Sequence, residues 1–206
     1  MEKPLTAVVV GDGAVGKSTL CMYLANQPLG DLLSRSILES FNVLVKTKEG
    51  ERNIVVYDTA GQEDNSSQKR SEIYRDASIL IICYSCISPS SFENVTAKWL
   101  PELRVYNTTA PITLVSTKTD LVQDEYLLSR LAERGLVPVP SKSGKQLAKE
   151  IRAYDYLELS CTNETAPNCS CVVEQLFTDF IEEAESPEKH AKKSHSKKKK
   201  HDCVVV

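Results

Sequence analysis

Short apolar runs rich in Val and Ile recur along most of the chain, and stretches with helical periodicity separate most of them. This alternation is typical of a parallel sheet covered by helices. It predicts strands at residues 5–10, 52–57, 78–84, 112–115 and 156–159. Residues 42–48 instead alternate apolar and polar side chains and meet the next strand across Glu49 and Gly50, which predicts an antiparallel edge hairpin. The expected fold class is therefore α/β, with a six-stranded, mostly parallel sheet and helices on both faces.

Helical periodicity predicts helices at residues 16–25, 90–106, 125–134, 143–151 and 171–185. Pro101 predicts a bend in the helix at residues 90–106. The 206 residues suffice for one core and are short for two domains. We therefore expect one domain at residues 1–186. Residues 187–206 are mostly Lys, His and Ser without apolar periodicity, so we expect a disordered tail.

The net charge of −3 hides an asymmetry between the body and the tail. Residues 189–206 carry seven Lys against one Asp, about +6, which leaves about −9 for the rest of the chain. An acidic body argues against wrapping nucleic acid. A terminal lysine block suits an anionic membrane surface or a nuclear-import receptor, so the tail is expected to direct the protein to a location.

The histidines and cysteines exclude several classes of enzyme. All three His lie in the tail, so the body has no imidazole for a catalytic triad, a general base or a zinc site. The seven Cys are scattered and no signal peptide opens the chain, which predicts a reducing cytosol. Cys83 and Cys86 have the spacing of a redox or zinc pair, but no second pair accompanies them, so that alternative is disfavoured. No apolar run reaches the eighteen residues of a membrane span.

Residues 11–18, GDGAVGKS, satisfy the pattern GxxxxGK[ST] between the first predicted strand and the first predicted helix. The glycines let backbone N–H groups converge on phosphate oxygens at a helix N-terminus. Lys17 can reach the β and γ phosphates, and the Ser18 hydroxyl can bind Mg²⁺. The alternative is an ordinary Gly-rich turn, which the flanking strand and helix disfavour.

A second motif, DTAGQE, follows the third strand at residues 58–63, at the carboxyl end of the sheet, where open α/β sheets bind ligands. Asp58 can hold Mg²⁺ through water, and the Gly61 N–H can meet the γ-phosphate. Gln62 can orient an attacking water and is the candidate catalytic residue. Alone the segment could be a simple turn. Its occurrence together with residues 11–18, here called the phosphate loop, argues for a nucleotide-binding site.

The series GDGAVGKS, DTAGQED, TKTD at 117–120 and SCT at 160–162 resembles the motif series of Ras-superfamily small GTPases in order and spacing. Within the superfamily the chain is most similar to the Rho family. The similarity rests on Asp12 inside the phosphate loop, on SPSSFEN at 88–94 followed by Lys98 and Trp99, on an extra segment at 123–140 similar to the Rho insert helix, and on the terminal CVVV.

The resemblance covers about residues 5–185 and the last four residues, and it implies GTP and Mg²⁺ as cofactors, slow hydrolysis and switching between partner-binding states. It implies metal ligation by Ser18 and Ser36, and by Asp58 through water. The nucleotide-binding residues that it implies are Gly11, Asp12, Gly13, Ala14, Val15, Gly16, Lys17, Ser18, Thr19, Ser36, Asp58, Thr59, Ala60, Gly61, Thr117, Lys118, Asp120, Ser160, Cys161 and Thr162.

Thr117 departs from the superfamily pattern, which has Asn at this position. Lys118 can still pack on the base, and Asp120 can still accept hydrogen bonds from two guanine donors. The lost Asn amide is expected to forfeit about 1 kcal/mol and a tie to the phosphate loop, against about 1.5 to 3 kcal/mol for Asp120 with guanine. The resemblance therefore implies that guanine specificity survives with reduced affinity and faster release.

The two switch segments also depart from the family pattern. Ser36 falls where the family has the Thr that senses Mg²⁺ and γ-phosphate; alternatively, residues 27–41 are a divergent surface loop in which Ser36 contacts nothing. Leu29 and Leu33 replace aromatic rings, which favours a looser switch and fast exchange. Residues 65–72 replace a Tyr- and Leu-rich contact surface of the family, and the segment is one residue longer. Standard Rho-family partners are therefore not expected to recognise this second switch.

The tail combines Cys203, four residues from the end, with a lysine block, and this fits a prenylation box and its polybasic companion. One lipid chain anchors marginally, and each Lys near an anionic leaflet adds about 1 kcal/mol. The alternative is a solvated tail with an idle Cys. The lysines concerned are Lys192, Lys193, Lys197, Lys198, Lys199 and Lys200.

We therefore expect a monomeric GTPase switch at the cytoplasmic face of the plasma membrane or endomembranes, with a cytosolic pool. Its expected partners are an exchange factor, a GTPase-activating protein, effectors and the anionic membrane surface, with no nucleic acid. Actin organisation follows from family analogy alone. Two alternatives stay open: a GTP-loaded or fast-exchanging binding scaffold, and an ATP-dependent phosphotransferase, which Lys118 and Asp120 disfavour.

Overall fold

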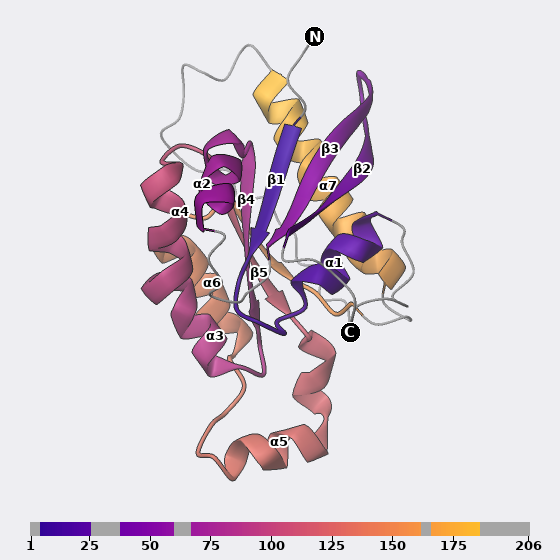
Figure 1. Ribbon diagram of the computed structural model, residues 1–206. Helices are drawn as coiled ribbons and strands as arrows, with labels where there is room; N and C mark the ends of the chain where they lie inside the picture. The colour runs from indigo at the N-terminus through magenta and orange to yellow at the C-terminus, as the bar shows by residue number, and fades with distance from the viewer. Residues whose placement is uncertain (1–4, 26–37, 60–66, 162–165, 186–206) are drawn as a thin grey trace.

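Six strands form one sheet in the order β2-β3-β1-β4-β5-β6 (Figure 1). The structure, a computed structural model, describes residues 5–25, 38–59, 67–161 and 166–185. All neighbouring strands run parallel except β2 and β3, which are antiparallel, and the predicted fold class is confirmed. The strands are β1 Leu5–Val10, β2 Leu38–Thr47, β3 Gly50–Thr59, β4 Ile79–Ser85, β5 Ile112–Thr117 and β6 Asp155–Glu158.

Helices cover both faces of the sheet, because successive strand residues point to opposite sides. Ala7 and Val9 pack in one core with α1 and α7, whereas Val8 and Val10 pack in the other with α2, α4 and α6. The helices are α1 Lys17–Leu24, α2 Ser67–Asp76, α3 Pro89–Asn94, α4 Leu100–Tyr106, α5 Glu125–Ala132, α6 Ser141–Glu150 and α7 Ala166–Glu185. No described helix is both long and apolar enough to cross a bilayer.

The edge hairpin is present, but its turn lies one residue earlier than predicted. Thr47 pairs with Gly50, so Lys48 and Glu49 form the turn and Gly50 opens β3. Gly50 has φ +128°, a conformation that residues with a Cβ rarely adopt. The glycine therefore occupies the first position of β3, directly after the turn.

The helix predicted at 90–106 is present as three consecutive segments. A π-helical turn, η2 Val95–Trp99, joins α3 to α4 immediately before Pro101. A proline ring clashes with the carbonyl of the residue four positions earlier, here Ala97, and removes one hydrogen bond. The irregularity thus lies in the turn before the proline, where that carbonyl must be accommodated.

Helix α2 was not predicted, because Ser67–Asp76 is almost entirely polar. Tertiary contacts stabilise it: Tyr74 is fully buried and donates to Glu102 Oε1 at 2.9 Å. The Asn107 side chain donates to the carbonyls of Tyr74 and Ala77 at 2.8 and 3.1 Å and so caps the end of the helix. A short polar helix of this kind gains its stability from packing rather than from its own propensity.

The insert region projects from the body of the molecule. Helix α5 has no buried residue and lies beyond the carboxyl ends of the parallel strands (Figure 1). Its first turn is capped by Asp124, whose side chain accepts from the Leu127 N–H at 3.0 Å. A short 3-10 helix, η3 Thr119–Gln123, connects it to β5. The insert helix implied by the Rho resemblance is therefore present in this place.

Candidate nucleotide-binding site

The phosphate loop joins β1 to α1 at the carboxyl edge of the sheet. A Cβ at Gly11 would clash with the backbone carbonyl of Cys83, so the loop can lie this close to β4 only with glycine at this position. Gly16, with φ +99°, is the N-cap of α1 and provides no side-chain cap. The first N–H groups of α1 are therefore left for another acceptor, and such groups at a helix N-terminus bind anions.

Lys17 is almost completely buried at this helix N-terminus, with 5% of its surface exposed. Its Nζ donates to the backbone oxygen of Asp12 at 2.7 Å. Burial lowers the pKa of Lys17 from its ordinary value, and the negative charge of Asp58 opposes this shift. A buried ammonium group beside free helix N–H groups is a donor set that suits phosphate oxygens.

Asp58 is the last but one residue of β3, its charge acts on Lys17, and it is itself 7% exposed. The neighbouring Thr59 is fully buried, and its hydroxyl donates to the Val9 carbonyl at 2.8 Å, so Thr59 joins β3 to β1. Ser18 and Thr19 follow Lys17 in the first turn of α1. The hydroxyl of Ser18 and the carboxylate of Asp58 are hard oxygen ligands, the kind that Mg²⁺ prefers.

The Asp12 side chain is hydrogen-bonded to the helical segments that follow β4. Its carboxylate accepts from Trp99 Nε1 and from Asn94 Nδ2, both at 2.7 Å. Trp99 is fully buried, so two charge-assisted hydrogen bonds connect the phosphate loop to the ends of α3 and η2. Asn94 and Trp99 both belong to the stretches that carry the Rho resemblance, but their spacing alone did not indicate this contact.

Residues 117–120, here called the guanine motif, were expected to lack a tie to the phosphate loop, and the structure corrects this expectation at Thr117. Its hydroxyl oxygen lies 2.5 Å from the Val15 carbonyl and 3.0 Å from the Tyr84 carbonyl, and the residue is 3% exposed. The β-branched hydroxyl reaches the loop directly because the loop passes immediately over the end of β5. Thr117 therefore keeps a tie to the phosphate loop without an amide.

The rest of the guanine motif is positioned by neighbouring strands. Lys118 has a left-handed backbone, with φ +60°, and its carbonyl accepts from the Cys86 thiol at 3.1 Å. Ser160, after β6, donates from its hydroxyl to Asp120 Oδ1 at 2.6 Å. The structure thus brings Asp120 and Ser160 together, as the motif series predicts, and leaves the second Asp120 oxygen for a base donor.

The thiols of the CxxC pair carry no redox signature. Cys83 and Cys86 are both buried and free. Burial raises the pKa of Cys83 to about 12 and that of Cys86 to about 11, so both stay protonated near neutral pH. Among the described residues, no group of three or more acidic, His or Cys side chains could hold a metal ion.

Several predicted site residues lie outside the described residues, and their roles stay predictions. They include the candidate catalytic Gln62 and the cysteine of the proposed lipid anchor. The residues concerned are Ser36, Ala60, Gly61, Gln62, Thr162, Lys192, Lys193, Lys197, Lys198, Lys199, Lys200 and Cys203. Cys161 is described and half-buried beside Ser160, and Gly13, Ala14 and Val15 complete the phosphate loop.

Comparisons with known proteins agree with this arrangement. Residues 6–186 match the model of the Ras family. The proteins named Rho-related GTP-binding protein RhoV from Rattus norvegicus, Mus musculus and Homo sapiens are each 39% identical over 182 residues, which covers 88% of this chain and 76% of theirs. The chain therefore belongs to the Ras family of small GTPases as a divergent Rho member, and it is a GTP hydrolase.

Proposed function

We propose that the chain is a membrane-anchored GTP/GDP switch that hydrolyses GTP slowly and signals through its two switch loops. The observation that carries this proposal is the convergence of a buried ammonium, uncapped helix N–H groups and a buried carboxylate at one edge of the sheet. Lys17 is a buried cation whose pKa is lowered mainly by burial, and the negative charge of Asp58 opposes this shift. A phosphate group would supply further negative charge beside this cation.

The residues at this edge divide the binding task between them. Lys17 and the first N–H groups of α1 would hold the β and γ phosphates. Mg²⁺ would be held by the hydroxyls of Ser18 and Ser36 and by Asp58 through water, and it would neutralise charge on the phosphates. Asp120, oriented by Ser160, would accept the guanine donors. Gly13 has no neighbour within 4 Å of an added Cβ, so the phosphate loop has open space beside this residue.

Hydrolysis in this proposal depends on Gln62, which would orient the attacking water. The chain has no recognisable arginine finger of its own, so intrinsic turnover is slow. An activating protein that inserts an Arg would raise the rate by about 10³ to 10⁵. An exchange factor and effectors would act on the switch loops. A role in actin organisation rests on analogy with the Rho family.

Single-turnover hydrolysis of GTP by the full chain tests this role. Gln62→Leu is expected to lower the rate by at least about tenfold, and Gln146→Leu, the same substitution at an exposed position of α6, is expected to leave it unchanged. Equal rates for the parent and Gln62→Leu would refute the role of Gln62. Equal partner binding in the GDP and GTP-analogue forms would instead favour a scaffold that does not respond to the nucleotide.

Membrane attachment in this proposal depends on a prenyl group at Cys203 and on the lysine block before it. Flotation with liposomes tests it, using protein purified from a eukaryotic host. The parent is expected to float with anionic liposomes and to lose most of its binding in Cys203→Ser. Cys171→Ser, a change at an exposed cysteine of α7, serves as the control. Equal flotation of the parent and Cys203→Ser would refute the anchor.

A further inference from the structure

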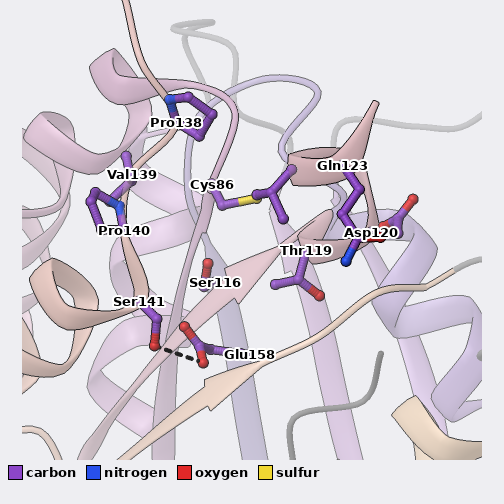
Figure 2. Close-up of a pocket in the computed structure, with 11 residues that line it drawn as sticks. Cys86, Ser116, Thr119, Asp120, Gln123, Pro138, Val139, Pro140, Ser141 and Glu158 are labelled. Carbon is purple, nitrogen blue, oxygen red and sulfur yellow. Dashed lines mark hydrogen bonds between the residues drawn. The ribbon is translucent and has the colours of Figure 1, made fainter. Parts of the chain in front are cut away.

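A pocket of about 530 Å³ lies between the guanine motif and the segment that returns from α5 to α6. We call it the insert pocket. In Figure 2, Pro138, Val139 and Pro140 lie on one side of it and Thr119, Asp120 and Gln123 on the other. Its volume falls in the range of small-molecule sites. The lining residues are Cys86, Ser116, Thr119, Asp120, Val122, Gln123, Pro138, Val139, Pro140, Ser141 and Glu158.

The backbone around the insert pocket is preorganised by three contacts of a single residue. The N–H of Cys86 donates to the Thr117 carbonyl at 3.1 Å, and its thiol donates to the Lys118 carbonyl at 3.1 Å. Its own carbonyl accepts from the Val139 N–H at 2.7 Å. Cys86 therefore connects the end of β4 to both walls, the guanine motif and the returning segment. A pocket held in this way costs a ligand little ordering of the protein.

The charges that the described residues contribute to the insert pocket are all of one sign. Asp120 and Glu158 contribute carboxylates, and none of the described Lys or Arg residues lines the pocket. Glu158 accepts from the Ser141 hydroxyl at 3.0 Å (Figure 2). It also accepts from the Tyr156 hydroxyl at 2.9 Å, and both donors are neutral. Within the described part of the chain, neither carboxylate forms an ion pair. A carboxylate offers about four acceptor positions, so Glu158 can accept further hydrogen bonds.

We propose that the insert pocket binds a small organic cation, namely an apolar ring or chain that carries a protonated amine or amidine. The cationic group would bind Glu158, and the apolar body would lie against Val139 and the two prolines beside it. An anion would be repelled by two carboxylates, and a wholly apolar ligand would desolvate Glu158 without compensation. Asp120 would remain available to guanine, so the two ligands can bind together.

Occupation of this pocket would act on nucleotide release, and this consequence rests on the proposed function. Thr119 and Asp120 form one wall, and Cys86 holds the carbonyls of Thr117 and Lys118 in the same arrangement. A ligand that binds this arrangement stabilises it. The guanine motif is then held in its base-binding form, and GDP release slows.

Binding is tested by NMR on the isotope-labelled full chain loaded with GDP and Mg²⁺. The probes are benzamidine and its neutral isostere benzamide. Benzamidine is expected to shift the amide signals of Cys86, Thr119 and Val139 and to bind at least about fivefold more tightly than benzamide, because a hydrogen bond to a charged group exceeds a neutral one by about 1 kcal/mol. Equal affinities, or shifts confined to other parts of the protein, would overturn the proposal.

Two variants test whether the cationic group binds at Glu158. Glu158→Gln is expected to abolish the preference for benzamidine while its unfolding midpoint stays close to that of the parent, since the amide oxygen can still accept from Tyr156. Glu133→Gln, an equal charge change at the exposed end of α5, is expected to keep the preference. A preference that survives in Glu158→Gln would overturn the assignment to this pocket.

Release of fluorescent GDP then separates the two proposals. Saturating benzamidine is expected to slow release from the parent and to have no effect on Glu158→Gln. Unchanged release with intact benzamidine binding would overturn the coupling to the guanine motif. Absence of GDP binding would refute the proposed function and leave the cation site standing, because the probe comparison can be repeated without nucleotide.

Discussion

Replacing Thr117 by Val removes one hydroxyl from beneath the phosphate loop and changes almost nothing else, because the two side chains have nearly the same shape. That hydroxyl lies 2.5 Å from the Val15 carbonyl and 3.0 Å from the Tyr84 carbonyl, in a residue that is 3% exposed. Removing one partner of a buried hydrogen bond costs about 1–3 kcal/mol. If this loss falls on the nucleotide-bound state, GDP release accelerates by about 5- to 150-fold.

Stopped-flow release of fluorescent GDP measures this effect, with chemical unfolding of the same samples to monitor stability. Thr117→Ser keeps the hydroxyl and is expected to release GDP close to the parent rate. Thr113→Val is the matched control, since Thr113 is fully buried in the same strand and its hydroxyl has no hydrogen-bond partner among the described residues. Release from Thr117→Val at the parent rate would refute the structural role assigned to Thr117.

The same geometry gives an expectation for Thr117→Asn, the substitution that restores the superfamily residue. An Asn amide would replace one neutral tie to the phosphate loop by another, so the release rate is expected to change by less than about threefold. A much larger slowing would show that the hydroxyl is a poor substitute for the amide. The fast release that the superfamily pattern suggested for Thr117 would then be correct after all.

The remaining predictions concern three other positions. Lys17→Met is expected to weaken GDP binding by at least about tenfold, measured by nucleotide titration. Burial lowers the pKa of Lys17, so the unfolded chain binds the proton more tightly than the folded protein does. The unfolding free energy of the nucleotide-free parent should therefore rise with pH between this lowered pKa and 10.5, and Lys17→Met should lack that slope. Trp99→Phe is expected to lower the unfolding free energy by about 1–3 kcal/mol in urea, because the Asp12 carboxylate loses a donor; an unchanged midpoint would contradict this. Gly144→Ala is expected to cost about 1–3 kcal/mol in the same assay, since the added Cβ would fall on two tyrosine hydroxyls, and full stability would refute that clash.

The sequence by itself determined the elements whose signals are local. The apolar run at β1 has the predicted bounds Leu5–Val10, and the pattern GxxxxGK[ST] falls between β1 and α1, as predicted. Such signals depend on residues within one turn or one strand, so they are readable without a partner. The edge hairpin was found for the same reason, with an error of one residue in its turn.

Only the tertiary structure decided which distant groups meet. Thr117 contacts a carbonyl 102 positions earlier, and Trp99 donates to an aspartate 87 positions earlier. Helix α2 is polar by sequence and is held by Tyr74 and Asn107, and the insert pocket forms where β4, β5, β6 and the returning segment converge. Hydrogen bonds of this kind depend on a few tenths of an ångström, which strand packing sets and sequence spacing does not encode.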